Sequence, residues 1–270
     1  MKRIHLIELH EQSWYPSIWR KPFQALLASV VNFSDPFAGS REILNKLFSI
    51  VRPREILDLC SGSGELSVHV LVNNTDIVQN EPQARIFLSD LFPNVESYRA
   101  LKEAYPELVN YYPEPINVLA PGVSGDIWMM LESFHHFKPE QAKIILENAA
   151  TNAQGIIILE TTGRTITNLL INATLVPFMA AFSMVFKVKP FRLSNLLWGL
   201  LIPVVPLTAT FDGFVSHLRT YTPEELLEIT DSIGSSDFHW EAGLIAMPET
   251  PMLSSTYLIG YRQPDPSGLA

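Results

Sequence analysis

One short stretch, residues 55–67 (EILDLCSGSGELS), constrains the fold of this chain more than any other. Residues 56–59 read as a buried strand, residues 60–64 form a turn of small residues, and a helical pattern begins at Glu65. A glycine turn between a strand and a helix N-terminus lets backbone N–H groups approach a ligand closely. The helix end adds a partial positive charge suited to a carboxylate or phosphate. The stretch therefore predicts a ligand-binding turn.

Asp58 sharpens this interpretation, because a carboxylate at an apolar strand end needs a ligand or an N–H partner. The turn lacks the GxGxxG pattern of nicotinamide enzymes and the GK[ST] ending of a phosphate loop. The motif DLCSGSG resembles motif I of class I S-adenosylmethionine (SAM) dependent methyltransferases, which is close to DxGxGxG. Cys60 stands where the first glycine is usual. The alternative is an ordinary tight turn without a ligand.

Strand and helix patterns alternate beyond this turn. The further predicted strands cover residues 84–89, 115–119, 126–131 and 156–159. Helical patterns lie between them, and another covers residues 40–50 before the first strand. Such alternation predicts a parallel sheet with right-handed crossovers.

The C-terminal third ends with a helix and two strands. Thr222-Pro223-Glu224-Glu225 is a strong helix start, and residues 238–243 and 255–262 read as an antiparallel pair at one sheet edge. This order resembles the methyltransferase ending, in which a reversed last strand inserts beside the sixth. We therefore predict an α/β fold with a doubly wound, mostly parallel seven-stranded Rossmann-like sheet and an apolar helical insertion.

The resemblance implies a SAM site at the ends of these strands. We expect the cofactor to contact Asp58, Cys60, Ser61, Gly62, Gly64, Asp90, Leu91, Asn117, Val118, Leu131 and Glu132. Asp90 closes the second predicted strand, where an acid accepts hydrogen bonds from ribose hydroxyls, unless it is a turn aspartate before Pro93. The family implies adenine contacts for Asn117 and Val118. Glu132 either faces the methionyl ammonium or is a solvated strand-end residue.

An adjacent histidine pair follows the fourth predicted strand, in the sequence FHHF. Histidine transfers protons readily near neutral pH, so His135 or His136 is a candidate base for an acceptor hydroxyl. Alternatively, the pair caps the strand and holds the next helix. His217 is a third candidate base, within a second candidate acceptor site that contains Asp212, His217, Arg219 and Tyr221. We expect no metal cluster, and a single cysteine excludes an iron–sulfur radical-SAM mechanism.

Two runs without charge, 165–186 and 193–211, interrupt the alternation. Each is about as long as a membrane span, but asparagines and prolines interrupt both runs. Lys187, Lys189 and Arg192 at the hairpin tip also oppose crossing. The runs form either a cap around an apolar acceptor pocket or a surface resting in a bilayer interface, with Trp198 and the basic residues at the headgroups. We favour an apolar cap with peripheral membrane contact through 165–211, over a plain packing layer.

Composition sets the remaining bounds. A net charge of −9 argues against a nucleic-acid partner. One cysteine and no secretory signal favour a cytoplasmic protein, with membrane association through the apolar runs. We expect a helical lid at 1–50, a SAM-binding domain at 51–262 with a cap at 161–219, and a tail at 263–270.

The leading hypothesis is SAM-dependent methyl transfer to an apolar or lipid-like small molecule. A second hypothesis keeps SAM but replaces methyl transfer with cyclisation or decarboxylation. A third is a membrane-surface binding protein with a degenerate methyltransferase fold, of which Cys60 would be the sign.

Overall fold

The computed structural model describes residues 1–262 apart from 34, 36, 120–123, 235–236 and 248–249. The chain forms two compact units: a sheet unit (Phe37–Thr161 and Thr222–Ala270) and a helical unit (Met1–Pro36 and Thr162–Tyr221). The first boundary lies between residues 36 and 37, earlier than the predicted residue 50, because residues 41–51 bury their apolar face in the core of the sheet unit. The predicted tail at 263–270 lies outside the described residues.

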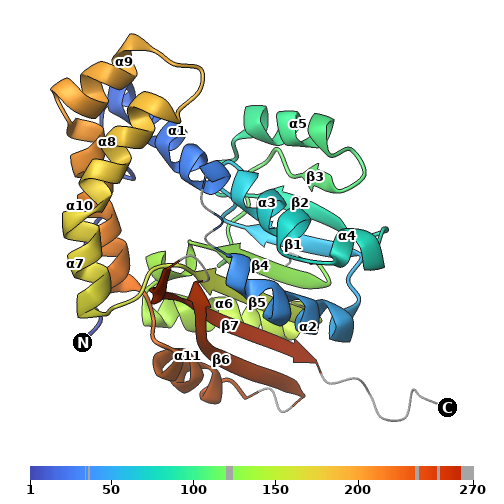
Figure 1. The fold of residues 1–270 in the computed structure, drawn as a ribbon. Coiled ribbons are helices and arrows are strands. Elements are labelled where there is room, and N and C mark those ends of the chain that lie inside the picture. Colours follow the sequence, from blue (N-terminus) through green and yellow to red (C-terminus); the bar gives the residue numbers. More distant parts are fainter. Residues whose placement is uncertain (34, 36, 120–123, 235–236, 248–249, 263–270) are drawn as a thin grey trace. The chain divides into compact units, whose positions relative to one another are not determined.

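The sheet unit contains one seven-stranded sheet of order β3-β2-β1-β4-β5-β7-β6 (Figure 1). Its strands are β1 Glu55–Leu59, β2 Arg85–Ser89, β3 Val109–Tyr111, β4 Ile127–Leu131, β5 Gly155–Glu160, β6 Phe238–Met247 and β7 Thr250–Arg262. The first five strands are parallel, and β7 lies antiparallel between β5 and β6. The predicted fold class is confirmed.

The strand order reverses at β1, which pairs with β2 on one side and β4 on the other. Every residue of β4 and β5 is buried, as expected of parallel strands covered on both faces. In open parallel sheets, ligands bind outside the carboxyl ends of the strands where the order reverses. The motif at residues 60–64 follows β1 and therefore lies at this point.

The strand predicted at 115–119 is wrong. The third strand is β3, Val109–Tyr111, which pairs with β2. Residues 115–119 form a loop: the N–H of Leu119 donates to the Asn117 side chain at 3.0 Å, and the N–H of Ile116 donates to the carbonyl of Asp90 at 2.9 Å. An asparagine that bonds the backbone two residues later favours a turn over a strand.

Six α-helices among the described residues of the sheet unit cover the sheet: α2 Arg41–Val51, α3 Glu65–Asn73, α4 Ile77–Asn80, α5 Val95–Ala104, α6 Pro139–Asn152 and α11 Pro223–Asp231. The helix α3 begins at Glu65, as predicted. The predicted capping box of α11 is also present, because Thr222 and Glu225 each accept a hydrogen bond from the other's backbone N–H.

The helical unit contains α1 Ser17–Phe33, α7 Ile166–Thr174, α8 Val176–Phe186, α9 Leu193–Leu196 and α10 Val204–Arg219, with a π-helical turn at Leu197–Leu201. Phe23 and Leu26 of α1 form a core with Met184 of α8 and Val205 of α10. This shared core explains why residues 1–36 and 162–221 form one unit although 125 residues separate them.

Two asparagines of the first apolar run bond to backbone carbonyls, and one of these bonds joins α7 to α10. The Asn172 side chain donates to the carbonyl of Thr210 at 2.7 Å, and the Asn168 side chain donates to the carbonyl of Gly163 at 3.1 Å. Both asparagines are buried. Among the described residues no single helix is long and apolar enough to cross a bilayer, but α7–α8 and α9–α10 pass that test as pairs bent by 45° and 61°.

The N-terminal segment is fixed along α10 by buried charges. Arg219 forms an ion pair with Glu8 at 3.1 Å, and Asp212 accepts backbone N–H groups from Leu9 and His10 at 2.6 and 3.1 Å. The guanidinium of Arg3 lies 4.0 Å from the centroid of the Tyr221 ring. Three residues of the second candidate acceptor site, Asp212, Arg219 and Tyr221, thus have partners within the helical unit.

Candidate functional site

The turn after β1 holds three alternate residues in the left-handed region. The φ angles are 62° at Cys60, 58° at Gly62 and 80° at Gly64. Cysteine thus takes the conformation that glycine supplies more readily, at a cost of roughly 1–2 kcal/mol. The departure from the family motif therefore leaves the turn intact. The N–H of Ser61 donates to the carbonyl of Ser89 at 2.9 Å and ties the turn to the end of β2.

The two glycines of the turn serve different purposes. A Cβ on Gly64 would lie 2.6 Å from Leu88 Cδ1, so the glycine lets α3 begin close to β2. A Cβ on Gly62 would meet nothing within 4 Å, and the residue is exposed. Gly64 is therefore required by packing, whereas Gly62 borders open space in which a ligand can approach the backbone.

Asp58 lies at the end of β1 with only 1% of its surface exposed. Neither carboxylate oxygen has a hydrogen-bond partner of good geometry among the described residues. Burial raises the pKa of Asp58 to about 7 and the charge of Asp90 adds to this, while the hydroxyls of Ser67 and Ser61 offset it only in part. An orphaned buried carboxylate at a switch point fits a cofactor that brings N–H groups or positive charge.

Asp90 follows β2 and faces the same turn. One of its oxygens accepts the N–H of Gly62 at 2.9 Å, and the other accepts the N–H of Phe92 at 2.8 Å. Leu91 is 46% exposed beside it. Because Ile116 bonds to the Asp90 carbonyl, the loop carrying Asn117 and Val118 also reaches this strand end, although it is not a strand.

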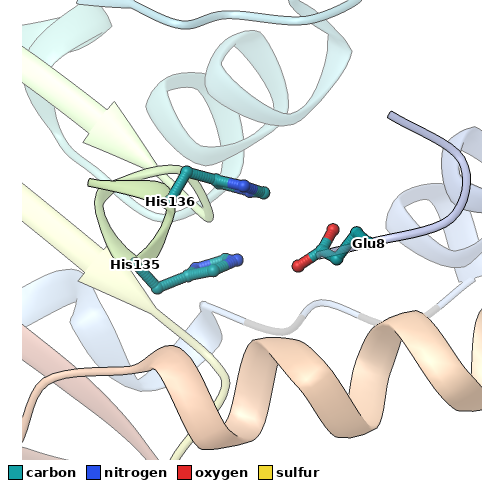
Figure 2. A group of neighbouring side chains, drawn as sticks. All are labelled: Glu8, His135 and His136. Carbon is teal, nitrogen blue, oxygen red and sulfur yellow. The ribbon is translucent and has the colours of Figure 1, made fainter. Parts of the chain in front are cut away.

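The histidine pair lies in a short 3-10 turn, Phe134–His136, after β4. His135 is buried, and its Nδ1 lies 2.6 Å from Oε2 of Glu160 at the end of β5. The other oxygen of Glu160 accepts the backbone N–H of His135 at 3.1 Å. The two imidazole rings lie close together, with centroids 4.2 Å apart and ring planes tilted by 34° (Figure 2). Glu160 thus fixes both the backbone and the ring of His135. Glu8, also drawn there, belongs to the helical unit.

Glu132 directly follows β4 and is a second acid near His135 and Glu160. Its φ of 50° is left-handed, its N–H donates to the carbonyl of Leu159 at 3.0 Å, and its carboxylate accepts the N–H of Thr161. Burial, and to a smaller extent the charge of Glu160, raise the pKa of Glu132 to about 7. The hydrogen bonds from Thr161 and the charge of His135 lower it only in part. Leu131 beside it is buried.

Three side chains near this strand end place ligand atoms within 4.8 Å of one another: Glu132, His135 and Glu160. That spacing would admit a metal ion. However, the hydrogen bond between His135 and Glu160 already explains their approach without an ion.

His217 is distant in sequence from the other candidate bases, His135 and His136, and does not belong to the sheet unit. It belongs to α10 of the helical unit, and its Nδ1 accepts the N–H of Gly163 at 3.0 Å. This bond fixes the neutral tautomer with the proton on Nε2. The structure therefore brings together the predicted residues after β1, β2 and β4 in the sheet unit, and places His217 in the helical unit.

Sequence reasoning missed three residues of this strand edge. Glu160 holds His135, and Ser89 donates its hydroxyl to the carbonyl of Asp58 at 2.7 Å. The hydroxyl of Tyr98 is buried without a partner among the described residues, and burial raises its pKa. The signal for Glu160 was present in the sequence, because a glutamate that ends a wholly apolar strand is costly unless it is paired.

No family model matches this chain, and no characterised protein matches it in sequence. Solved structures do match in fold. The plantazolicin methyltransferase BpumL in complex with SAH has a TM-score of 0.57 at 13% identity, covering 94% of each chain. Human N-acetylserotonin methyltransferase in complex with SAM has a TM-score of 0.51 at 12% identity, covering 94% of this chain and 60% of that chain.

An O-methyltransferase family protein from Burkholderia thailandensis also matches, with a TM-score of 0.49 at 18% identity. The match covers 87% of this chain but only 57% of that protein, so this chain spans little more than half its length. At these identities the comparisons establish the fold alone. Together with the strand order, they show that this chain has the fold of class I SAM-dependent methyltransferases.

Proposed function

We propose that this protein transfers a methyl group from SAM to an apolar or lipid-like small molecule. The observation that carries the proposal is the turn after β1. Left-handed backbone at Cys60, Gly62 and Gly64, open space at Gly62 and the orphaned carboxylate of Asp58 all lie at the switch point of this fold. Two structures of the same fold are complexes with SAH or SAM, which supports the same cofactor here.

The residues of the strand edge would hold the cofactor as follows. Asp58 is a buried acid without a hydrogen-bond partner on its carboxylate oxygens among the described residues, and Glu132 is a partly buried acid whose carboxylate accepts one backbone N–H, so both would favour the positive charge of the methionyl ammonium. Asp90 is half-buried and holds the Gly62 N–H, leaving acceptor capacity for ribose hydroxyls. Asn117, Val118 and Leu91 border the same end of β2 and would meet the adenine.

When bound, SAM supplies an electrophilic methyl group. The protein's part is to position an acceptor atom in line with that group and to accept a proton where the acceptor is a hydroxyl. The Nδ1–H group of His135 donates a hydrogen bond to the Glu160 carboxylate. The ring nitrogen that can accept a proton is therefore Nε2. Glu160 also stabilises the imidazolium that a proton transfer would form. A carbon or amine acceptor would need no such base.

The charge-free composition of 165–186 and 193–211 supports an apolar acceptor. These two runs contain no charged side chain that could bind a highly polar acceptor. Apolar and lipid-like hydroxyl compounds are therefore the first acceptors to screen.

Calorimetric titration of the whole chain with S-adenosylhomocysteine tests the cofactor site. Gly62→Asn places a side chain in the open space, and asparagine tolerates the left-handed region better than most residues. Gly234→Asn is the matched control, because a Cβ on Gly234 also meets nothing within 4 Å and this position follows α11, far from the motif in sequence.

We expect micromolar binding by the wild type and by Gly234→Asn. Gly62→Asn should bind at least about tenfold more weakly, because a side chain in the space that the cofactor occupies costs on the order of 1–2 kcal/mol of binding free energy. Binding by Asp90→Ala should also be weakened. Absence of binding by folded wild-type protein would overturn the proposal. With an acceptor in hand, methylated product together with S-adenosylhomocysteine supports methyl transfer. Product formed without consumption of SAM would assign the cyclisation or decarboxylation alternative.

A further inference from the structure

The helical unit has an apolar core, but it also exposes many large apolar side chains and buries several polar ones. Most of the large apolar side chains that the structure shows exposed belong to it, although the sheet unit is the larger of the two. Asn168, Asn172, Asp212 and Arg219 are buried in its interior. A helix in a soluble protein normally shows the opposite pattern, and a large exposed apolar patch marks a surface that binds something.

The pattern is clearest on α8. Its exposed residues, with the one before it, recur every three or four positions and so share one face: Leu175, Phe178, Met179, Phe182 and Phe186. Phe178 is 73% exposed, whereas Ala180 and Met184 on the other face are buried in the core of the unit. The exposed face is therefore a surface left uncovered by the fold of this unit.

A basic loop adjoins this face. Residues 187–192 connect α8 to α9, and the chain here exposes Lys189 and Arg192 beside Phe191 and Leu193. From residue 165 to 211 there is no acidic residue, and Lys187, Lys189 and Arg192 are the only charged ones. This run is thus positive in a chain whose net charge is −9.

We propose that this face docks in the interface of a bilayer that contains anionic lipids. The phenylalanines would enter the boundary between headgroups and acyl chains, and Lys189 and Arg192 would meet the lipid phosphates. A second copy of the chain fits less well, because a two-fold contact through this face would bring two basic loops together. Trp198, expected at the headgroups, instead packs edge-on against Trp19 with centroids 6.0 Å apart.

Sedimentation of the whole chain with vesicles tests this inference, which does not depend on the proposed methyl transfer. The vesicles are phosphatidylcholine alone, or phosphatidylcholine with phosphatidylglycerol. Phe178→Ser removes an apolar anchor, and Phe92→Ser is its control, because Phe92 is 83% exposed in the sheet unit. Arg192→Glu reverses a charge of the loop, and the exposed Arg99→Glu in α5 is its control.

We expect binding to the anionic vesicles that Phe178→Ser weakens about fivefold or more and Arg192→Glu about tenfold, with both controls unchanged. Binding should also fall with added salt. Absence of sedimentation with anionic vesicles would overturn the proposal. It would also be overturned if the protein bound equally to both kinds of vesicle and Arg192→Glu bound as well as the wild type. Vesicle-independent self-association that Phe178→Ser abolishes would assign the face to a second copy instead.

Discussion

Substitution of Asp58 by asparagine should flatten the pH dependence of stability in the ligand-free protein. The pKa of Asp58 is about 7 in the folded chain and 3.8 when unperturbed, chiefly because the carboxylate is buried. Between these values the folded protein holds a proton that the unfolded chain has lost. The free energy of unfolding therefore falls as pH rises through this window.

Each pKa unit corresponds to about 1.4 kcal/mol, so Asp58 should cost about 2–3 kcal/mol of stability between pH 5 and pH 8. Glu132 has a similar pKa of about 7 and a similar sign. Over this interval Asp58→Asn should therefore lose about 2–3 kcal/mol less than the wild type, while the contribution of Glu132 remains in both proteins. The change with pH is the quantity to compare, because an unpaired amide carries a burial cost of its own.

Urea unfolding at pH 5 and pH 8, followed by far-ultraviolet circular dichroism, measures this difference. Asp231→Asn makes the same chemical change at an exposed position of the sheet unit and should follow the wild type. Identical pH dependence in wild type and Asp58→Asn would refute the argument that Asp58 is buried without a partner.

Three further substitutions test the site. Cys60→Gly should stabilise the protein by about 1 kcal/mol in urea unfolding, because glycine adopts a φ of 62° without strain; a loss of stability would contradict this. Gly64→Ala should destabilise by about 2 kcal/mol or more, since the new Cβ meets Leu88 at 2.6 Å, and an unchanged urea midpoint would show that the side chain moves aside. Glu160→Gln should lower kcat for a hydroxyl acceptor about tenfold or more, and shift its pH profile, with little change in S-adenosylhomocysteine affinity; a purely structural role for the pair with His135 would leave the pH profile unchanged.

Much of the sheet could be predicted because its strands are short, apolar and separated by clear helix starts. The first, second, fourth and fifth strands lie within one or two residues of their predicted bounds. The third failed because β3 has three residues, with Asn110 at its centre, whereas the loop at 115–119 contains more apolar residues. Residues 109–111 form the strand because they pair with β2, and no local sequence pattern shows this pairing.

The candidate site could be predicted only where a motif marks it. The glycines, Asp58 and Asp90 lie together at one strand edge, as the resemblance implied. Glu160 was missed because its role depends on a partner 25 residues away in sequence. The joining of residues 1–36 to residues 162–221 in one unit was beyond reach for the same reason, since Phe23 meets Met184 only in the folded helical unit.

The position of β7 has a consequence for how the protein is made. Its partner β5 ends at Glu160, yet β7 ends at Arg262, so a ribosome must add about 100 residues, for about 5–20 s, before that edge is covered. During this time β5, which is apolar except for Glu160 at its end, is a strand with an open edge, the kind of template on which nascent chains associate. Slow translation between these strands, or loss of β7, should therefore divert the chain toward chaperones and aggregates before any catalytic defect can be seen.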